Sequence, residues 1–108
     1  MFKSLKFYIS QTIEHRWLLR NLTEFGYNRQ QQVQGEADFS LRGGIIDIFP
    51  VTFECPIRIE LDMDKVSSIY SFNITTGKAI WSHQIVIILP KRKFDTLIYV
   101  IHDETNCL

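Results

Sequence analysis

Apolar side chains recur along residues 12–25 with the period of an amphipathic helix. They fall on one face of a helix with about 3.6 residues per turn, and they are Ile13, Trp17, Leu18, Leu22 and Phe25. The hydroxyl of Thr12 can cap the first turn, and Gly26 can adopt the left-handed conformation that ends many helices. The pattern predicts one helix over residues 12–25.

After Gly26 the pattern changes to the alternation of apolar and polar positions that is typical of β-strands. Gly43 and Gly44 separate two such stretches, and a glycine pair favours a tight hairpin turn. The residues 85–89 form a continuous apolar run, which predicts a strand covered on both faces. Strands are predicted at residues 3–9, 38–42, 45–49, 57–61, 66–72 and 85–89, and residues 27–33 are expected to be extended but polar.

One helix and a meander of short strands predict the class of fold. The chain has 108 residues, which suits a single domain. We expect an α+β domain with a mostly antiparallel sheet of five or six short strands and one main helix.

The charge balance argues against a partner bound mainly through phosphates. Twelve Lys and Arg residues balance twelve Asp and Glu residues, so the formal net charge is zero, whereas such domains usually carry a basic excess. One basic cluster, Lys91, Arg92 and Lys93, can touch phosphate, or it can be a charged segment that protects an aggregation-prone strand. We expect nucleic acid not to be the partner of this domain alone.

The spacing of the two cysteines and the length of the apolar runs indicate where in the cell the protein is expected. Cys55 and Cys107 lie far apart and fit neither a metal-binding spacing nor a dense disulfide framework. We expect two free thiols in a reducing compartment. No apolar run approaches the ~20 residues of a membrane span, and the N-terminus lacks the apolar stretch of a signal peptide. The expected location is therefore cytoplasmic, with no membrane partner.

Motifs of catalysis and cofactor binding are missing from the sequence. The Gly77-Lys78 pair has Phe72 where a phosphate-binding loop needs a glycine. The histidines His15, His83 and His102 show no metal-ligand spacing with acidic residues, and no serine or cysteine lies in a nucleophile elbow. We expect no enzyme activity, no cofactor and no metal site.

One stretch of the sequence resembles a known family. It contains GYNR at residues 26–29, RGGIIDIFP at residues 42–50 and PIRIE at residues 56–60. These strings resemble the UvrB-interaction-type domain that the excision repair protein UvrB shares with transcription-repair coupling factors (Mfd). The paired glycines and the short gap before Pro56 are more similar to the coupling factors than to UvrB. The resemblance covers residues 12–90, so we assign residues 1–94 to this domain and residues 95–108 to a C-terminal tail that lacks the resemblance.

The resemblance implies a docking role in nucleotide excision repair and transcription-coupled repair. Domains of this type bind the damage sensor UvrA, and the family's binding positions fall on Arg42, Arg58 and Glu60. Asp62 stands where the family's partner surface has an aromatic side chain, and Lys65 reverses another charge. The coupling factors are ATP-dependent DNA translocases, and the helicase motifs are missing here. The resemblance therefore implies a fragment or truncated relative, with a re-tuned interface or a different partner. In a larger parent protein, other domains are an alternative partner that could mask the same surface.

The residue pattern agrees with this assignment but leaves alternatives open. Arg42 points away from the apolar side of its strand, and Arg58 and Glu60, two residues apart, share a face. Alternatively, Arg58 and Glu60 serve only as a pair within the sheet.

Two other functions also remain open. The first is a small nucleic-acid-binding module, in which the cluster of Lys91, Arg92 and Lys93 contacts phosphates and Tyr70 or Trp81 stacks on bases. The second is a stand-alone competitor of UvrB–UvrA docking.

Overall fold

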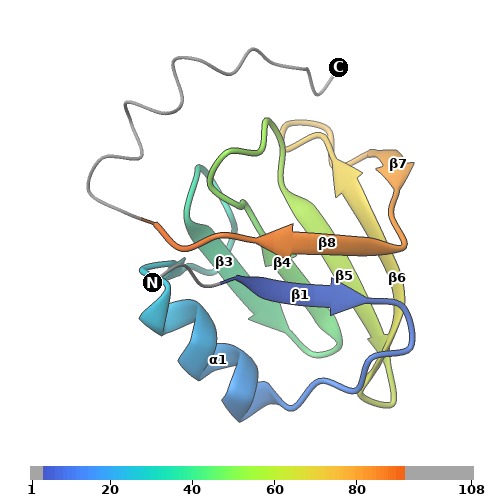
Figure 1. The fold of residues 1–108 in the computed structure, drawn as a ribbon. Coiled ribbons are helices and arrows are strands. Elements are labelled where there is room, and N and C mark those ends of the chain that lie inside the picture. Colours follow the sequence, from blue (N-terminus) through green and yellow to red (C-terminus); the bar gives the residue numbers. More distant parts are fainter. Residues whose placement is uncertain (1–3, 92–108) are drawn as a thin grey trace.

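The computed structural model describes residues 4–91 of the chain (Figure 1). The C-terminal tail expected at residues 95–108 lies outside the described residues. The elements in chain order are β1 (Leu5–Tyr8), α1 (His15–Glu24), β2 (Asn28–Arg29), β3 (Asp38–Arg42), β4 (Ile45–Ile48), β5 (Ile57–Asp62), β6 (Lys65–Phe72), β7 (Ala79–Ser82) and β8 (Ile85–Ile88).

The strands form two sheets. The larger sheet has six strands in the order β2-β3-β4-β5-β6-β7, and the smaller sheet pairs β1 with β8. Among the strands of residues 4–91, only the short β2–β3 pair is parallel, and every other pair is antiparallel. The expectation of an α+β domain with one helix and a mostly antiparallel sheet is confirmed.

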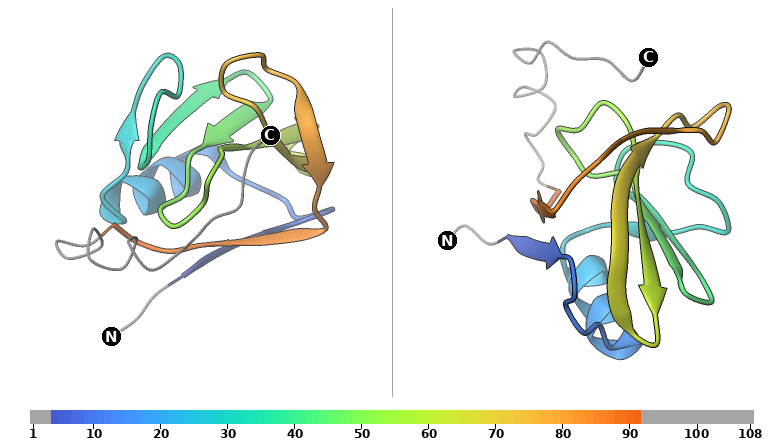
Figure 2. Two further views of the ribbon diagram at one scale, coloured as in Figure 1. Left: turned by 90° about the horizontal axis from the view of Figure 1, so that it is seen from above. Right: turned by 90° about the vertical axis from the view of Figure 1, so that its right-hand side faces the viewer.

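The core lies on one face of the six-stranded sheet. Helix α1 and the β1–β8 pair pack against that face, as the two views of Figure 2 show. The core joins Phe7 of β1, Leu18 and Leu22 of α1, and Ile46 and Ile59 of the sheet, all of them buried. None of α1, β1 and β8 lies on the opposite face, which we call the open face.

The helix begins three residues later than the sequence pattern predicts. Its N-cap is Glu14, which makes no side-chain capping hydrogen bond. Thr12 instead forms a β-bridge with Lys65, and the Ile13 N–H donates to the Asp64 carbonyl at 2.8 Å. This backbone pairing takes residues 12 and 13 out of the helix. The predicted end is confirmed, because Gly26 has a φ of +90°.

The strand predictions are wrong at two places. Strand β8 is not covered on both faces, since Val86 and Ile88 are buried but Ile85 and Ile87 are each 48% exposed. The β1–β8 pair forms an outer layer, so only one of its faces meets the core. In addition, β7 was not expected. Of residues 27–33, which are expected to be extended, Asn28 and Arg29 form β2.

The expected free thiol at Cys55 is also wrong. The Cys55 sulfur is disulfide-bonded, and Cys107 lies outside the described residues. The cysteines therefore no longer support the argument for a reducing compartment. Within residues 4–91, no helix has the length and apolar character needed to cross a lipid bilayer.

The glycine pair forms the predicted hairpin turn between β3 and β4. Arg42 and Ile45 are paired on either side of it, and Gly43 has a φ of +58°. Gly44 lies against the next strand, because a Cβ atom added there would be 3.0 Å from the Leu61 carbonyl oxygen. The turn therefore fixes the end of β3, which carries Arg42, against the end of β5.

We predict that Gly44→Ala lowers the free energy of unfolding by about 1–3 kcal/mol, the range for overpacking a well-packed site. The added methyl carbon would lie 3.0 Å from the Leu61 carbonyl oxygen, which is closer than an ordinary van der Waals contact. The backbone of β5 would therefore have to shift. Urea unfolding followed by circular dichroism measures the change. Gly35→Ala is the matched control, because no atom lies within 4 Å of its added Cβ. Equal losses in both variants would contradict the explanation.

Candidate functional site

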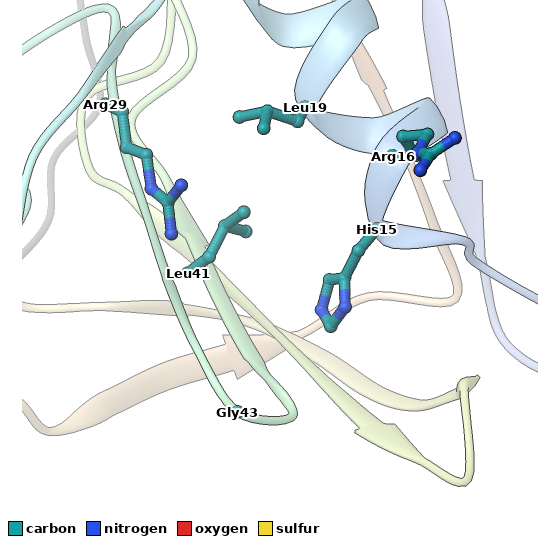
Figure 3. Close-up of a pocket in the computed structure, with 6 residues that line it drawn as sticks. All are labelled: His15, Arg16, Leu19, Arg29, Leu41 and Gly43. Atoms are coloured by element: carbon teal, nitrogen blue, oxygen red, sulfur yellow. The ribbon is translucent and has the colours of Figure 1, made fainter.

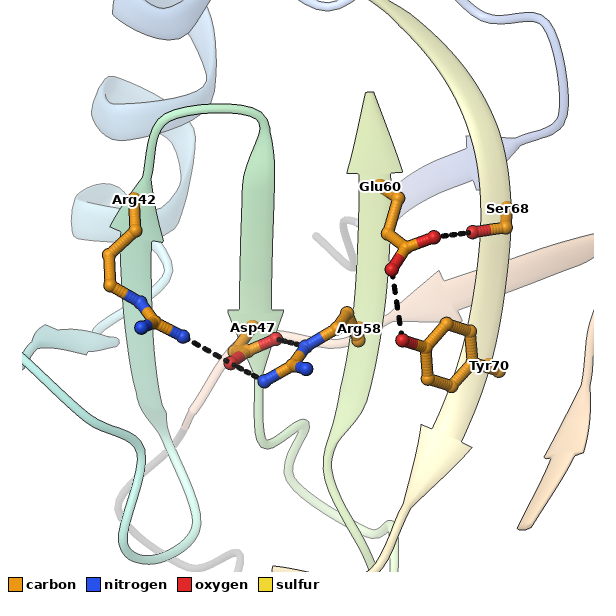
Figure 4. Close-up of polar contacts among 6 residues, drawn as sticks. All are labelled: Arg42, Asp47, Arg58, Glu60, Ser68 and Tyr70. Carbon is orange, nitrogen blue, oxygen red and sulfur yellow. Dashed lines mark hydrogen bonds and ion pairs between the residues drawn. The ribbon is translucent and has the colours of Figure 1, made fainter. Parts of the chain in front are cut away.

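The open face carries two rows of neighbouring side chains that cross the strands (Figure 4). The first row holds Ser40, Asp47, Arg58 and Tyr70. The second row holds Arg42, Ile45, Glu60 and Ser68. Because side chains alternate between the faces of a strand, the register brings the charged groups of β3, β4 and β5 together on this one face.

A bidentate ion pair lies at the centre of the first row. The Arg58 Nε donates to Asp47 Oδ1 at 2.8 Å, and its Nη2 donates to Asp47 Oδ2 at 2.9 Å. The Asp47 side chain is only 6% exposed and that of Arg58 is 22% exposed. The Arg58 guanidinium also lies over the Phe72 ring, 4.8 Å from its centroid. The hydrogen bonds with Asp47 are the main reason that the pKa of Arg58 is raised.

Arg42 reaches the same carboxylate from the other side. Its Nη2 is 4.0 Å from Asp47 Oδ2, and its side chain is 58% exposed. One buried carboxylate thus lies between two guanidinium groups, of which Arg58 is fixed and Arg42 extends into solvent. The three groups together carry one net positive charge.

Glu60 is held by hydroxyl groups of the adjacent strand β6. Its carboxylate accepts hydrogen bonds from the Ser68 hydroxyl at 2.7 Å and from the Tyr70 hydroxyl at 3.0 Å. Burial and the neighbouring Glu60 carboxylate raise the pKa of Tyr70, so the phenol keeps its proton. Among the described residues, no ion pair neutralises Glu60, and its negative charge remains available to a partner.

The geometry predicted for three of the four site residues is confirmed. Arg42, Arg58 and Glu60 lie on one face of the sheet. Asp62 is exposed at the end of β5, where it is paired in register with Lys65. The binding role of all four residues remains a prediction.

The polar contacts of these residues differ in part from the expected ones. Arg58 pairs with Asp47 on β4 rather than with Glu60. Sequence reasoning missed Ser68 and Tyr70 as the partners of Glu60. Ser68 and Tyr70 are two residues apart, so the sequence indicated that they share a face of their strand. Their pairing with Glu60 could not be predicted, because it depends on the register between β5 and β6.

These features define a class of protein: a small α+β domain that presents fixed charged groups on an open sheet face, as interaction domains do. A family model described as the UvrB interaction domain matches residues 5–94. The chain belongs to the UvrB interaction domain family.

Curated relatives are similar over about two thirds of the chain. The transcription-repair-coupling factor of Bacillus subtilis (strain 168) is 46% identical over 72 residues, which are 67% of this chain and 6% of that protein. The transcription-repair-coupling factor of Staphylococcus aureus (strain MSSA476) is 44% identical over 71 residues, which are 66% of this chain and 6% of that protein. The matched region thus spans only a small part of these relatives.

We predict that Arg58→Ala destabilises the fold and that Arg42→Ala does so much less. Removing Arg58 leaves the buried Asp47 carboxylate without its bidentate partner, at a cost of about 1–3 kcal/mol. Arg42 makes only a 4.0 Å contact and is mostly exposed, so its loss costs about 0–1 kcal/mol. Urea unfolding of both variants measures the difference.

The double variant Asp47→Asn/Arg58→Gln provides the control for this explanation. It removes both charges and keeps polar groups of similar size, and we expect it to be more stable than Arg58→Ala. Equal stability of the Arg42→Ala and Arg58→Ala variants would contradict the role assigned to Asp47.

Proposed function

We propose that this chain is a protein-docking domain of DNA repair that binds a UvrA-type damage sensor through its open face. Membership of the UvrB interaction domain family and the similarity to transcription-repair-coupling factors support the repair context. The observation that carries the proposal is the pair of guanidinium groups around Asp47, of which Arg58 is fixed and Arg42 is exposed. Arg42, Arg58 and Glu60 are the proposed contacts, and Asp62 is the proposed edge of the surface.

The arrangement suits recognition of a charged protein surface. A guanidinium group offers donors in a planar fork that matches a carboxylate. Arg58 uses its Nε and Nη2 for Asp47, and its side chain is still 22% exposed to a partner. Since Asp47 already holds this side chain, binding loses little rotamer freedom there. Glu60 adds an acceptor on the same face, so that a partner must present both acidic and basic groups.

The docking role needs no catalysis, and we propose that the chain acts by binding alone, without a cofactor. We also propose that it is a fragment or truncated relative of a coupling factor, because the region that matches these relatives makes up only 6% of their length. Asp62 and Lys65 alter the charge at the edge of the docking surface, and they are the proposed source of a re-tuned affinity.

The nucleic-acid alternative has less support. Of its basic cluster, Lys91 is exposed, and Arg92 and Lys93 lie outside the described residues. Trp81 is 52% exposed, but the hydroxyl of Tyr70 is bonded to the Glu60 carboxylate. That negative charge beside the Tyr70 ring disfavours an approaching phosphate backbone. The third possibility, a stand-alone competitor of UvrB–UvrA docking, would use the same surface.

We predict that Arg42→Ala weakens capture of the cognate UvrA protein by about tenfold or more, the range of an arginine at a binding hot spot. Arg42 is the better probe than Arg58 because its side chain is 58% exposed and its loss should leave the fold intact. Surface plasmon resonance with immobilised full-length chain measures the affinity, and a thermal melt checks folding.

Arg20→Ala is the matched control, because Arg20 is an exposed arginine on α1 and lies away from the open face. It should bind UvrA as the unaltered chain does. If Arg42→Ala binds as tightly as Arg20→Ala, the proposed surface is wrong. Absence of UvrA binding by the unaltered chain would remove the proposed partner.

A further inference from the structure

A groove lies beside the open face, between α1 and the β2–β3 edge of the sheet. A cleft of about 400 Å³ is lined by His15, Arg16, Leu19, Arg29, Leu41 and Gly43. A neighbouring cleft of about 890 Å³ is lined by Arg29, Gln30, Gln31, Gln32, Leu41 and Arg42. The two clefts are neighbours that share Arg29 and Leu41, and together we call them the basic groove.

The basic groove has an apolar floor. Leu19 of α1 and Leu41 of β3 approach each other across the first cleft in Figure 3. Both side chains are half-buried, and both pack against the edge of the core. They leave apolar surface that a ligand side chain of similar size can cover.

The rim of the basic groove is cationic. Arg16 and Arg29 are exposed on opposite sides of it, and Arg42 lies at its far end. No Asp or Glu is among the described residues that line it. In a chain of zero formal net charge, this collection of arginines is a local excess of positive charge.

Among residues 4–91, no carboxylate forms an ion pair with Arg16 or Arg29. The ion pairs within residues 4–91 involve only Arg42 and Arg58. Arg16 and Arg29 therefore differ from Arg58, whose guanidinium is bound to a buried carboxylate. Free guanidinium groups beside an apolar floor favour a ligand that carries carboxylates next to an apolar side chain.

We propose that the basic groove binds an acidic segment of a partner protein, in which a leucine-like side chain is flanked by Asp or Glu. The apolar side chain covers Leu19 and Leu41, and the flanking carboxylates pair with Arg16 and Arg29. The side-chain amides of Gln30, Gln31 and Gln32 are all exposed at one end of the groove, where they can bond the ligand backbone.

Nucleic acid fits the basic groove less well than an acidic peptide. Single strands are held by aromatic side chains on which bases stack, in addition to basic groups. The lining contains no Phe, Tyr or Trp among the described residues, and its apolar part consists of leucines. An aliphatic floor favours an aliphatic ligand side chain, and the observations therefore support a protein ligand.

The test uses the full chain and a fluorescein-labelled peptide of the sequence Glu-Glu-Asp-Leu-Leu-Asp-Glu-Glu in an anisotropy titration. We expect binding that weakens as salt rises, because charged side chains supply the attraction. Arg16→Ala/Arg29→Ala should weaken it by about tenfold or more. The control Arg20→Ala removes an arginine from the same helix outside the groove and should leave binding unchanged.

Two further probes separate the alternatives. A peptide with serine in place of both leucines should bind more weakly, since it cannot cover the apolar floor. Equal binding of the two peptides, or equal binding by the Arg16→Ala/Arg29→Ala variant, would overturn the proposal. Tighter binding of single-stranded oligothymidylate that is lost in this variant would assign the groove to nucleic acid instead. Because UvrA is absent from the assay, the outcome does not depend on the docking proposed for the open face.

Discussion

The buried carboxylate of Asp47 is the constraint on which the charged face of this domain depends. It lies on β4, inside the six-stranded sheet, and its side chain is only 6% exposed. A buried carboxylate is costly unless it is paired and hydrogen-bonded. Arg58 meets that need with two hydrogen bonds, and as a result its position is fixed. The group that satisfies the fold is therefore also the group that the open face presents to a partner.

The fold separates two kinds of cationic side chain. Arg58 is fixed by Asp47 and lies over Phe72, whereas Arg16 of α1 and Arg29 of β2 are exposed and line the groove. Arg42 lies between the two regions, because it approaches Asp47 at 4.0 Å and also lines the groove. A fixed arginine favours recognition of one geometry, and unpaired arginines favour attraction of an acidic ligand.

Most of the fold was predictable because the strand and helix periods are local properties. The alternation of residues 38–42, 45–49 and 57–61 predicts strands that the structure contains as β3, β4 and β5. The errors share a different cause. Thr12 joins a β-bridge with Lys65, and β8 belongs to a two-stranded outer layer. Each of these depends on contacts between segments that are far apart in the sequence, which a local pattern does not contain.

The sequence by itself determined the family motif, the class of fold and the common face of Arg58 and Glu60, since side chains two residues apart on a strand point the same way. Only the tertiary structure decided that Arg58 pairs with Asp47 and that Glu60 is held by Ser68 and Tyr70. These pairings follow from strand register, which is fixed by packing across the whole sheet. The basic groove likewise exists only because the chain folds α1 against the edge of that sheet.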